Sequence, residues 1–374
     1  MRGKQRFDVL VVYSSGMTQR VRRGSSNKSP FSLIACEKDY EKAYGYLLDS
    51  IAEYGLTVAF ATSDDVIATG TVSAYWTHDR DGWKAVRQAA FSEVIFDKLS
   101  PQTEIRKRQR ELLFSSPIIV PFNDPELYTL FFDKLRLAEQ LTTTTIPTVA
   151  LESGDSEAIE VARNRLMILT ELYSNRNDFA CDYILKDRYG AAGNHVYRIA
   201  ATNIGSIGKI ISENPKKSFI LQPMLLFDSG YQYKEWPGKT EIRLIFHNEK
   251  IVQTYLRIAE TTLGLCNGHQ GGNIIYQPIR SIPKKVRIAA ERVIVLLPKH
   301  DSLYALDFVV SNEGSVYLLE GNTGPGLNWD RANLADVAGA KKLMRIIAKI
   351  MASKVEQTRQ KKNILPKYLP VFAN

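Results

Sequence analysis

The chain has 374 residues, of which 44% are hydrophobic and 24% charged, which excludes a collagen, a coiled coil or a wholly disordered protein and suggests more than one domain. The formal net charge is +9, but residues 1–30 carry +6 and residues 353–374 carry +4, so the 322 residues between them carry −1. Because this body has no excess of basic residues, its charge argues against nucleic-acid binding, and the basic ends are expected to be solvated tails.

The first part of the chain alternates between strand and helix patterns. Strand patterns, the first of them ending in Ser14-Ser15-Gly16, cover residues 7–13, 56–61 and 116–120. Helical patterns cover residues 39–54, where Gly55 follows, and part of residues 86–99. Residues 17–30 form a basic loop rich in Ser and Gly. The alternation predicts an α/β domain with a parallel sheet over residues 1–121, without a G-x-G-x-x-G dinucleotide fingerprint.

A helix is expected next. Asp124 suits its N-cap, Pro125 suits its first position, and the helix continues over residues 126–141. Ile146-Pro147 leads into a strand, and strands and hairpins dominate from about residue 179. Turns are expected at residues 247–250 and 311–314, and a last helix at residues 338–351 before the polar tail.

The strongest functional signal is a buried hairpin formed by residues 305–310 and 315–322. An even-length turn would place Asp307 and Glu320 on one face of the paired strands, with Asn322 two residues further on that face. Two carboxylates and an amide oxygen that converge in this way suit Mg²⁺. A hydrogen-bonded polar network at the strand end is the alternative.

A second signal is a strand that ends in Lys186 and runs into a loop of small residues, Gly190-Ala191-Ala192-Gly193. A lysine and exposed backbone N–H groups can hold phosphates, although a hairpin turn has the same pattern. The loop is not a Walker A motif, because Gly-Lys-Ser/Thr is missing.

Two further segments place polar groups on apolar strands. Residues 219–226 contain Gln222, and this strand either presents backbone groups to an adenine or is only part of a core. Arg243 and Arg257 also lie on apolar strands, where each needs a carboxylate or phosphate partner. Structural salt bridges are the alternative for either arginine taken singly.

Other sites are not indicated by the sequence. Three cysteines and five histidines show neither C-x-x-C nor H-x-x-x-H spacing, which argues against a disulfide framework and a cysteine-rich zinc site. No apolar run reaches the length of a membrane span, and the start lacks a signal-peptide core. A cytoplasmic protein without a membrane partner is therefore expected.

Taken in order, these segments resemble the ATP-grasp superfamily, in particular carboxylate–amine ligases related to glutamate ligases and glutathione synthetase. The resemblance covers roughly residues 122–350. It rests on motifs at Asp133-Lys134, Ile146-Pro147, Lys186 with Gly190 and Gly193, Gln222 to Leu225, Glu241-Ile242-Arg243 with Arg257, Asn267 with Gly271-Gly272, and Asp307 with Glu320-Gly321-Asn322. Pro223 and Leu265 depart from the family pattern.

The resemblance implies an N-terminal Rossmann-like pre-ATP-grasp domain (1–121) and a two-subdomain ATP-grasp fold (122–225 and 226–352), followed by a basic tail (353–374), an architecture that mixes α/β and α+β. It also implies ATP and two Mg²⁺ ions, with Mn²⁺ as an alternative, the metal being held by Asp307, Glu320 and Asn322. Arg243 and Arg257 would be catalytic. The residues implied in nucleotide binding are Lys134, Lys186, Gly190, Ala191, Ala192, Gly193, Gln222, Met224, Leu225, Asp228 and Asn267.

The activity implied is ADP-forming ligation of a small-molecule carboxylate, such as an amino acid or peptide, to an amine through an acylphosphate. A homodimer is a family-level expectation. The alternatives are an ATP-grasp kinase that phosphorylates a small-molecule hydroxyl, and a nucleotide-binding regulator without catalysis.

Overall fold

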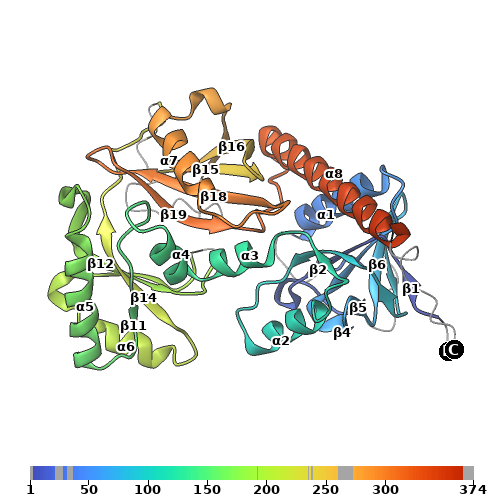
Figure 1. Ribbon diagram of the computed structural model, residues 1–374, viewed down its shortest axis with the longest axis horizontal. Helices are drawn as coiled ribbons and strands as arrows, with labels where there is room; N and C mark the ends of the chain where they lie inside the picture. Colours follow the sequence, from blue (N-terminus) through green and yellow to red (C-terminus); the bar gives the residue numbers. More distant parts are fainter. Residues whose placement is uncertain are drawn as a thin grey trace. The chain divides into compact units, whose positions relative to one another are not determined.

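The computed structural model describes residues 3–21, 28–31, 37–191, 193–234, 236, 239–259 and 273–364. The chain divides into two compact units (Figure 1): unit 1 comprises Met1–Asn123 with Gly326–Asn374, and unit 2 comprises Asp124–Pro325. The domain limits expected from the sequence differ from this division. The last helix, α8 (Leu334–Ile364), belongs with the N-terminal residues because it packs against α1 (Glu37–Ala52).

Unit 1 contains a mixed sheet whose parallel part was expected from the sequence. Its strands, in spatial order, are β10 (Val120–Pro121), β9 (Val94–Lys98), β2 (Val9–Tyr13), β3 (Val58–Thr62), β6 (Tyr75–Asp79) and β7 (Gly82–Val86). The first four are parallel, and β6 and β7 add antiparallel pairs. A smaller sheet contains β1 (Gln5–Arg6), β8 (Ala90–Phe91), β5 (Thr71–Val72) and β4 (Val66–Ala68).

The helical pattern predicted within residues 86–99 is wrong, because β8 and β9 occupy half of this segment and none of its residues is helical. Val94, Ile95 and Phe96 are buried in the parallel ladder with β2, so pairing with a distant strand decides their conformation. The basic residues 104–110 belong instead to a helix, α2 (Glu104–Leu113).

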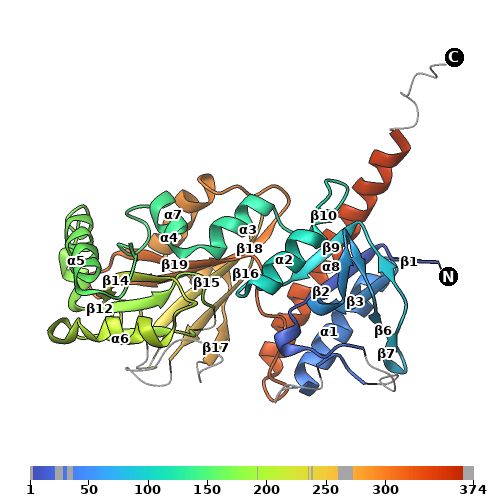
Figure 2. The ribbon, with the colours of Figure 1, turned by 90° about the horizontal axis from the view of Figure 1, so that it is seen from below.

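Helix α8 extends well beyond the predicted 338–351 and lies beside α1 in both views (Figures 1 and 2). The expectation of a solvated tail from residue 353 is wrong for residues 353–364, which continue the helix. Lys354 is buried, Arg359 pairs with Asp8 at 2.7 Å, and Lys362 pairs with Glu93 at 2.6 Å. These contacts tie the end of the helix to the strands of unit 1.

Unit 2 contains two sheets. The first is antiparallel, in the order β11 (Val149–Leu151), β14 (Phe219–Leu225), β12 (Phe179–Asp187) and β13 (Val196–Ile199). Helices α5 (Ser156–Thr170) and α6 (Ser206–Glu213) contribute side chains to a core on one of its faces, together with Leu185 and Leu221. Lys186 and Gln222 alternate with these leucines along β12 and β14, so they lie on the opposite face.

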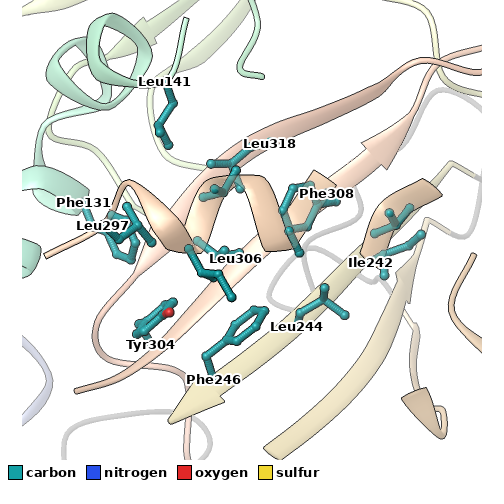
Figure 3. Packing of buried hydrophobic residues seen from close by; sticks show 14 of the residues in the cluster. Phe131, Leu141, Ile242, Leu244, Phe246, Leu297, Tyr304, Leu306, Phe308 and Leu318 are labelled. Atoms are coloured by element: carbon teal, nitrogen blue, oxygen red, sulfur yellow. The ribbon is translucent and has the colours of Figure 1, made fainter. Parts of the chain in front are cut away.

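The second sheet is also antiparallel, in the order β17 (Asn273–Tyr276), β16 (Lys250–Ile258), β15 (Thr240–His247), β18 (Leu303–Val310) and β19 (Val316–Asn322). Its core face is covered by α3 (Pro125–Phe132), α4 (Lys134–Gln140) and α7 (Lys284–Val295). Figure 3 shows the side chains that meet there, among them Phe131, Leu244, Phe246, Leu306 and Phe308. Both predicted hairpin turns, at 247–250 and 311–314, are confirmed.

The single helix expected at residues 126–141 is divided into α3 and α4. Asp124 caps α3 as predicted, since its Oδ1 accepts from the backbone N–H groups of Glu126 and Leu127. Asp133 then leaves the helical conformation and caps α4 in the same way. Its carboxylate also receives two hydrogen bonds from Arg188, which fixes the break.

Gly321 of β19 is required where α3 approaches the sheet. A Cβ atom at this position would lie 2.6 Å from ring carbons of Phe131, a buried aromatic side chain with little freedom to move. We therefore expect Gly321→Ala to lower the free energy of unfolding by about 2 kcal/mol through overpacking, as measured by urea denaturation. Gly205→Ala is the control, because nothing lies within 4 Å of its added Cβ. Equal stability of the two variants would contradict this packing.

Candidate functional site

Asp307, Glu320 and Asn322 lie on the face of the second sheet opposite its core. The turn between β18 and β19 has five residues, an odd number, and Val310 pairs with Val316. Uninterrupted pairing would bring Leu319 opposite Asp307. A β-bulge shifts the register by one residue, so that Glu320 pairs with Asp307 and Asn322 with Ala305. The predicted juxtaposition is thus confirmed, although a bulge produces it rather than an even turn.

Two arginines from neighbouring strands surround Asp307, which is completely buried. Arg243 on β15 binds both carboxylate oxygens, with Nε 2.5 Å from Oδ1, and also donates to the Tyr255 hydroxyl. Arg257 on β16 places Nη2 2.7 Å from Oδ2 of Asp307 and 2.6 Å from Oε2 of Glu241. The two arginines therefore have the carboxylate partners that the sequence required of them.

The charges of this cluster shift its acids in opposite directions. Burial alone would raise the pKa of Asp307, but Arg243 and Arg257 outweigh it and lower that pKa to about 2. Burial raises the pKa of Glu241 against the opposing effect of Arg257, with Asp307 and Glu320 adding repulsion. Glu320 is the more accessible acid, since 35% of its side chain is exposed.

The predicted phosphate-binding lysines lie close to this cluster. Burial lowers the pKa of Lys186 to about 8, and repulsion from Lys134 adds to the effect, while Glu320 and Glu241 oppose it. Burial also lowers the pKa of Lys134, against the attraction of Glu320 and of Asp187. Two cations with lowered pKa values next to an accessible carboxylate are suited to bind a polyanion together with a metal ion.

Two hydrogen bonds hold Gly190, at the start of the loop after Lys186. The Gly190 N–H donates to the carbonyl of Asp187, and the Lys134 ammonium donates to the Gly190 carbonyl. Gly193 has a φ of +73°, which favours glycine. Ala191 is exposed, and Ala192 lies outside the described residues. The structure thus brings Lys134, Lys186 and this loop together.

The other nucleotide-binding candidates are distributed along and beyond β14. Gln222 is buried and donates to Thr148 Oγ1 at 2.7 Å, while its Oε1 meets no partner among the described residues. Met224 is partly exposed, and Leu225 packs in a core cluster. Asp228 accepts from Asn312 in a surface network, and Asn267 lies outside the described part of the chain.

The oxygen atoms of Asp307, Glu320 and Asn322 fit a hard divalent cation. Within the described ranges no three His, Cys, Asp or Glu side chains form a metal cluster, so the candidate set depends on the amide of Asn322. Its Nδ2 lies 3.1 Å from Glu320 Oε1 and 3.4 Å from Asp307 Oδ2, which shows that the three side chains converge. Carboxylate and amide oxygens are the ligands that Mg²⁺ prefers.

Sequence reasoning assigned no role to Glu241, which the structure links to Asp307 through Arg257. The sequence does contain an indication of Glu241, because a carboxylate two residues before Arg243 lies on the same strand face as that arginine. The Asp133–Arg188 pair was also missed, since residues 55 positions apart gave no pattern that linked them.

The whole chain is similar in structure to several solved ligases. D-cycloserine synthetase aligns with a TM-score of 0.56 and 15% identity, over 93% of this chain and 99% of that one. D-alanyl-alanine synthetase A from Vibrio cholerae aligns with a TM-score of 0.57 and 13% identity, over 93% of this chain and 98% of that one. A RiPP-associated ATP-grasp ligase from Chryseobacterium gregarium, in complex with ADP and a leader and core peptide, aligns with a TM-score of 0.52 and 12% identity. This alignment covers 94% of this chain and 97% of that one.

The chain shares the ATP-grasp fold with these structures. No protein-family model matches the sequence, and no curated protein matches it either. The similarity therefore lies in the arrangement of the elements. No described helix is both long enough and apolar enough to span a membrane.

Proposed function

We propose that the protein is an ATP-dependent carboxylate–amine ligase that forms an amide or peptide bond and releases ADP and phosphate. The observation that carries this proposal is the convergence of Asp307, Glu320 and Asn322 with two arginines and two lysines of lowered pKa. The ATP-grasp fold supports it, since structural neighbours include two synthetases and an ATP-grasp ligase in complex with ADP.

The nucleotide would be bound by Lys134 of α4, by residues of the first sheet and by the loop after β12. Lys134 and Lys186 would neutralise phosphate oxygens, and the loop at residues 190–193 would offer backbone N–H groups to them. Gln222 has a buried Oε1 without a partner among the residues described, and such an acceptor suits the amino group of adenine. Met224 and Leu225 would provide backbone groups for the base. Asp228 would contribute as well, and so would Asn267, which lies outside the described residues.

The residues of the second sheet would act on the reacting groups. Asp307, Glu320 and Asn322 would hold Mg²⁺, which when bound offsets charge on the triphosphate. The substrate carboxylate attacks the γ-phosphate to form an acylphosphate, and the amine then displaces phosphate. Arg243 and Arg257 would stabilise the negative charge that develops on these oxygens. No protein nucleophile is needed in this sequence of steps.

The proposal also includes the metal ions, the substrate class, the oligomeric state and the domain limits. We infer two Mg²⁺ ions, with Mn²⁺ as a substitute, and an amino acid or peptide as substrate. We also retain the homodimer and the assignment of residues 1–121 as a Rossmann-like pre-ATP-grasp domain, with subdomains at residues 122–225 and 226–352. The parallel strands β10, β9, β2 and β3 support the assignment of the N-terminal domain.

A phosphate-release screen tests the proposed activity. The wild type is incubated with MgATP and amino acids or dipeptides, singly and in pairs, and free phosphate and coupled product are measured. A ligase releases phosphate in amounts equal to the amide formed and only when both a carboxylate and an amine are present. Transfer of the phosphoryl group to a hydroxyl would establish the kinase, and nucleotide binding without turnover over the whole panel would establish the regulator.

Nucleotide binding should take up a proton near pH 8. The pKa of Lys186 is about 8 in the nucleotide-free protein, and a neighbouring triphosphate raises it, so the bound state holds more protons around this pH. Affinity for MgATP is therefore expected to decrease as pH rises above 8. Calorimetry in two buffers of different ionisation enthalpy measures the uptake, which should vanish near pH 6 and in Lys186→Met. An absence of uptake at pH 8 would contradict this role of Lys186.

A further inference from the structure

One carboxylate oxygen of Asp307, the Oδ2 that Asn322 approaches, is fully occupied by the protein's own donors. Arg243 binds Oδ1 through Nε and Oδ2 through Nη2, and Arg257 binds Oδ2 through Nη2. The amide of Asn322 lies 3.4 Å from the same Oδ2. A carboxylate oxygen accepts about two hydrogen bonds through its lone pairs, so a cation that binds Oδ2 of Asp307 together with Asn322 has to displace at least one guanidinium.

Arg257 is the donor that can leave. Arg243 is held in place by two bonds to Asp307 and one to the Tyr255 hydroxyl. Arg257 gives Asp307 a single nitrogen, which it shares with Glu241 at a distance of 2.6 Å. The Nε of Arg257 is buried and meets no acceptor among the described residues. Arg257 therefore has a second carboxylate to remain with and an unused donor for another ligand.

We propose that Arg257 occupies the place of a divalent cation at Asp307 in the nucleotide-free protein and remains paired with Glu241 alone when the metal binds. Glu241 is then a positioning residue, because it keeps Arg257 at the site after Asp307 has exchanged partners. This inference rests on the proposed function, which supplies the metal. It implies that free metal binds weakly, since a buried guanidinium competes for the same carboxylate.

Titration of the nucleotide-free protein with Mn²⁺ alone, followed by electron paramagnetic resonance, measures this competition directly. The variants are Arg257→Met, which removes the competing charge, and Arg257→Lys, which keeps the charge on a shorter side chain whose ammonium is more strongly hydrated and so competes less well for Asp307. Arg198→Met is the matched control, since it removes one positive charge from the same unit at an exposed pair with Asp182. Thermal unfolding of each variant shows that it is folded.

We expect Arg257→Met to bind Mn²⁺ about tenfold or more tightly than the wild type. Arg257→Lys should bind with intermediate affinity, and Arg198→Met like the wild type. Because Arg257→Lys keeps its charge, it tests the exchange even if Arg257→Met fails to fold. Equal affinities of wild type and Arg257→Lys would overturn the inference, as would equal tightening in Arg198→Met. If the wild type releases phosphate in the ligase assay but shows no such competition, only this inference fails.

Discussion

Glu320→Gln is expected to lower the rate of amine-dependent phosphate release by about 10²–10³-fold and to weaken metal-dependent nucleotide binding. The substitution keeps the size of the side chain and removes the accessible carboxylate that faces Lys134 and Lys186. Because the side chain is 35% exposed, the fold should remain intact. Calorimetry with MgATP and the phosphate assay measure the two effects.

Glu313→Gln provides the matched control for this variant. Glu313 lies in the exposed turn between β18 and β19 and loses the same charge when substituted. Its binding and turnover should equal those of the wild type. If Glu320→Gln retained full metal-dependent binding and turnover, Glu320 would not be a metal ligand.

Asp307→Ala is expected to lower the free energy of unfolding by about 3–5 kcal/mol, because it leaves two buried guanidinium groups without their main partner. Urea denaturation measures the loss. Asp182→Ala breaks the exposed pair with Arg198 and should have little effect. Comparable stability of Asp307→Ala and the wild type would show that the arginines do not depend on Asp307.

The contribution of the Asp307 carboxylate to the free energy of unfolding depends on pH through the pKa of this group. The folded value of about 2 lies below the unfolded value of 3.8, so the stabilising effect is fully present above pH 3.8 and decreases as pH falls toward 2. The difference in unfolding free energy between wild type and Asp307→Asn should therefore shrink over that range. A difference that stays constant from pH 5 to pH 2 would show that charge is not its source.

Local patterns were enough to predict much of unit 2. Asp124 and Pro125 define the start of α3, and uninterrupted apolar runs define β18 and β19. Polar side chains on otherwise apolar strands identified Arg243 on β15, Arg257 on β16 and Asp307 on β18 as candidates. An arginine or aspartate on a buried strand requires a partner, and this requirement is visible in the sequence even where the partner is not.

Features that depend on distant contacts could not be predicted. The bulge at Leu319 places Glu320 opposite Asp307, and nothing in the hairpin sequence marks it. The break at Asp133 depends on Arg188, which belongs to the loop after β12. Val94–Lys98 form a strand because β2 is available for pairing. The contacts of Asp307 with both arginines could be predicted only from the pairing register of β15, β16 and β18.

The most direct test of the ligase proposal follows one oxygen atom. A carboxylate substrate found in the phosphate-release screen is labelled with a heavy oxygen isotope on both carboxylate oxygens, and the released phosphate is analysed by mass spectrometry. Formation of an acylphosphate followed by displacement with an amine transfers one labelled oxygen to each phosphate released. Unlabelled phosphate, with both labelled oxygens still on the substrate carbon, would contradict the acylphosphate and with it the proposed ligase.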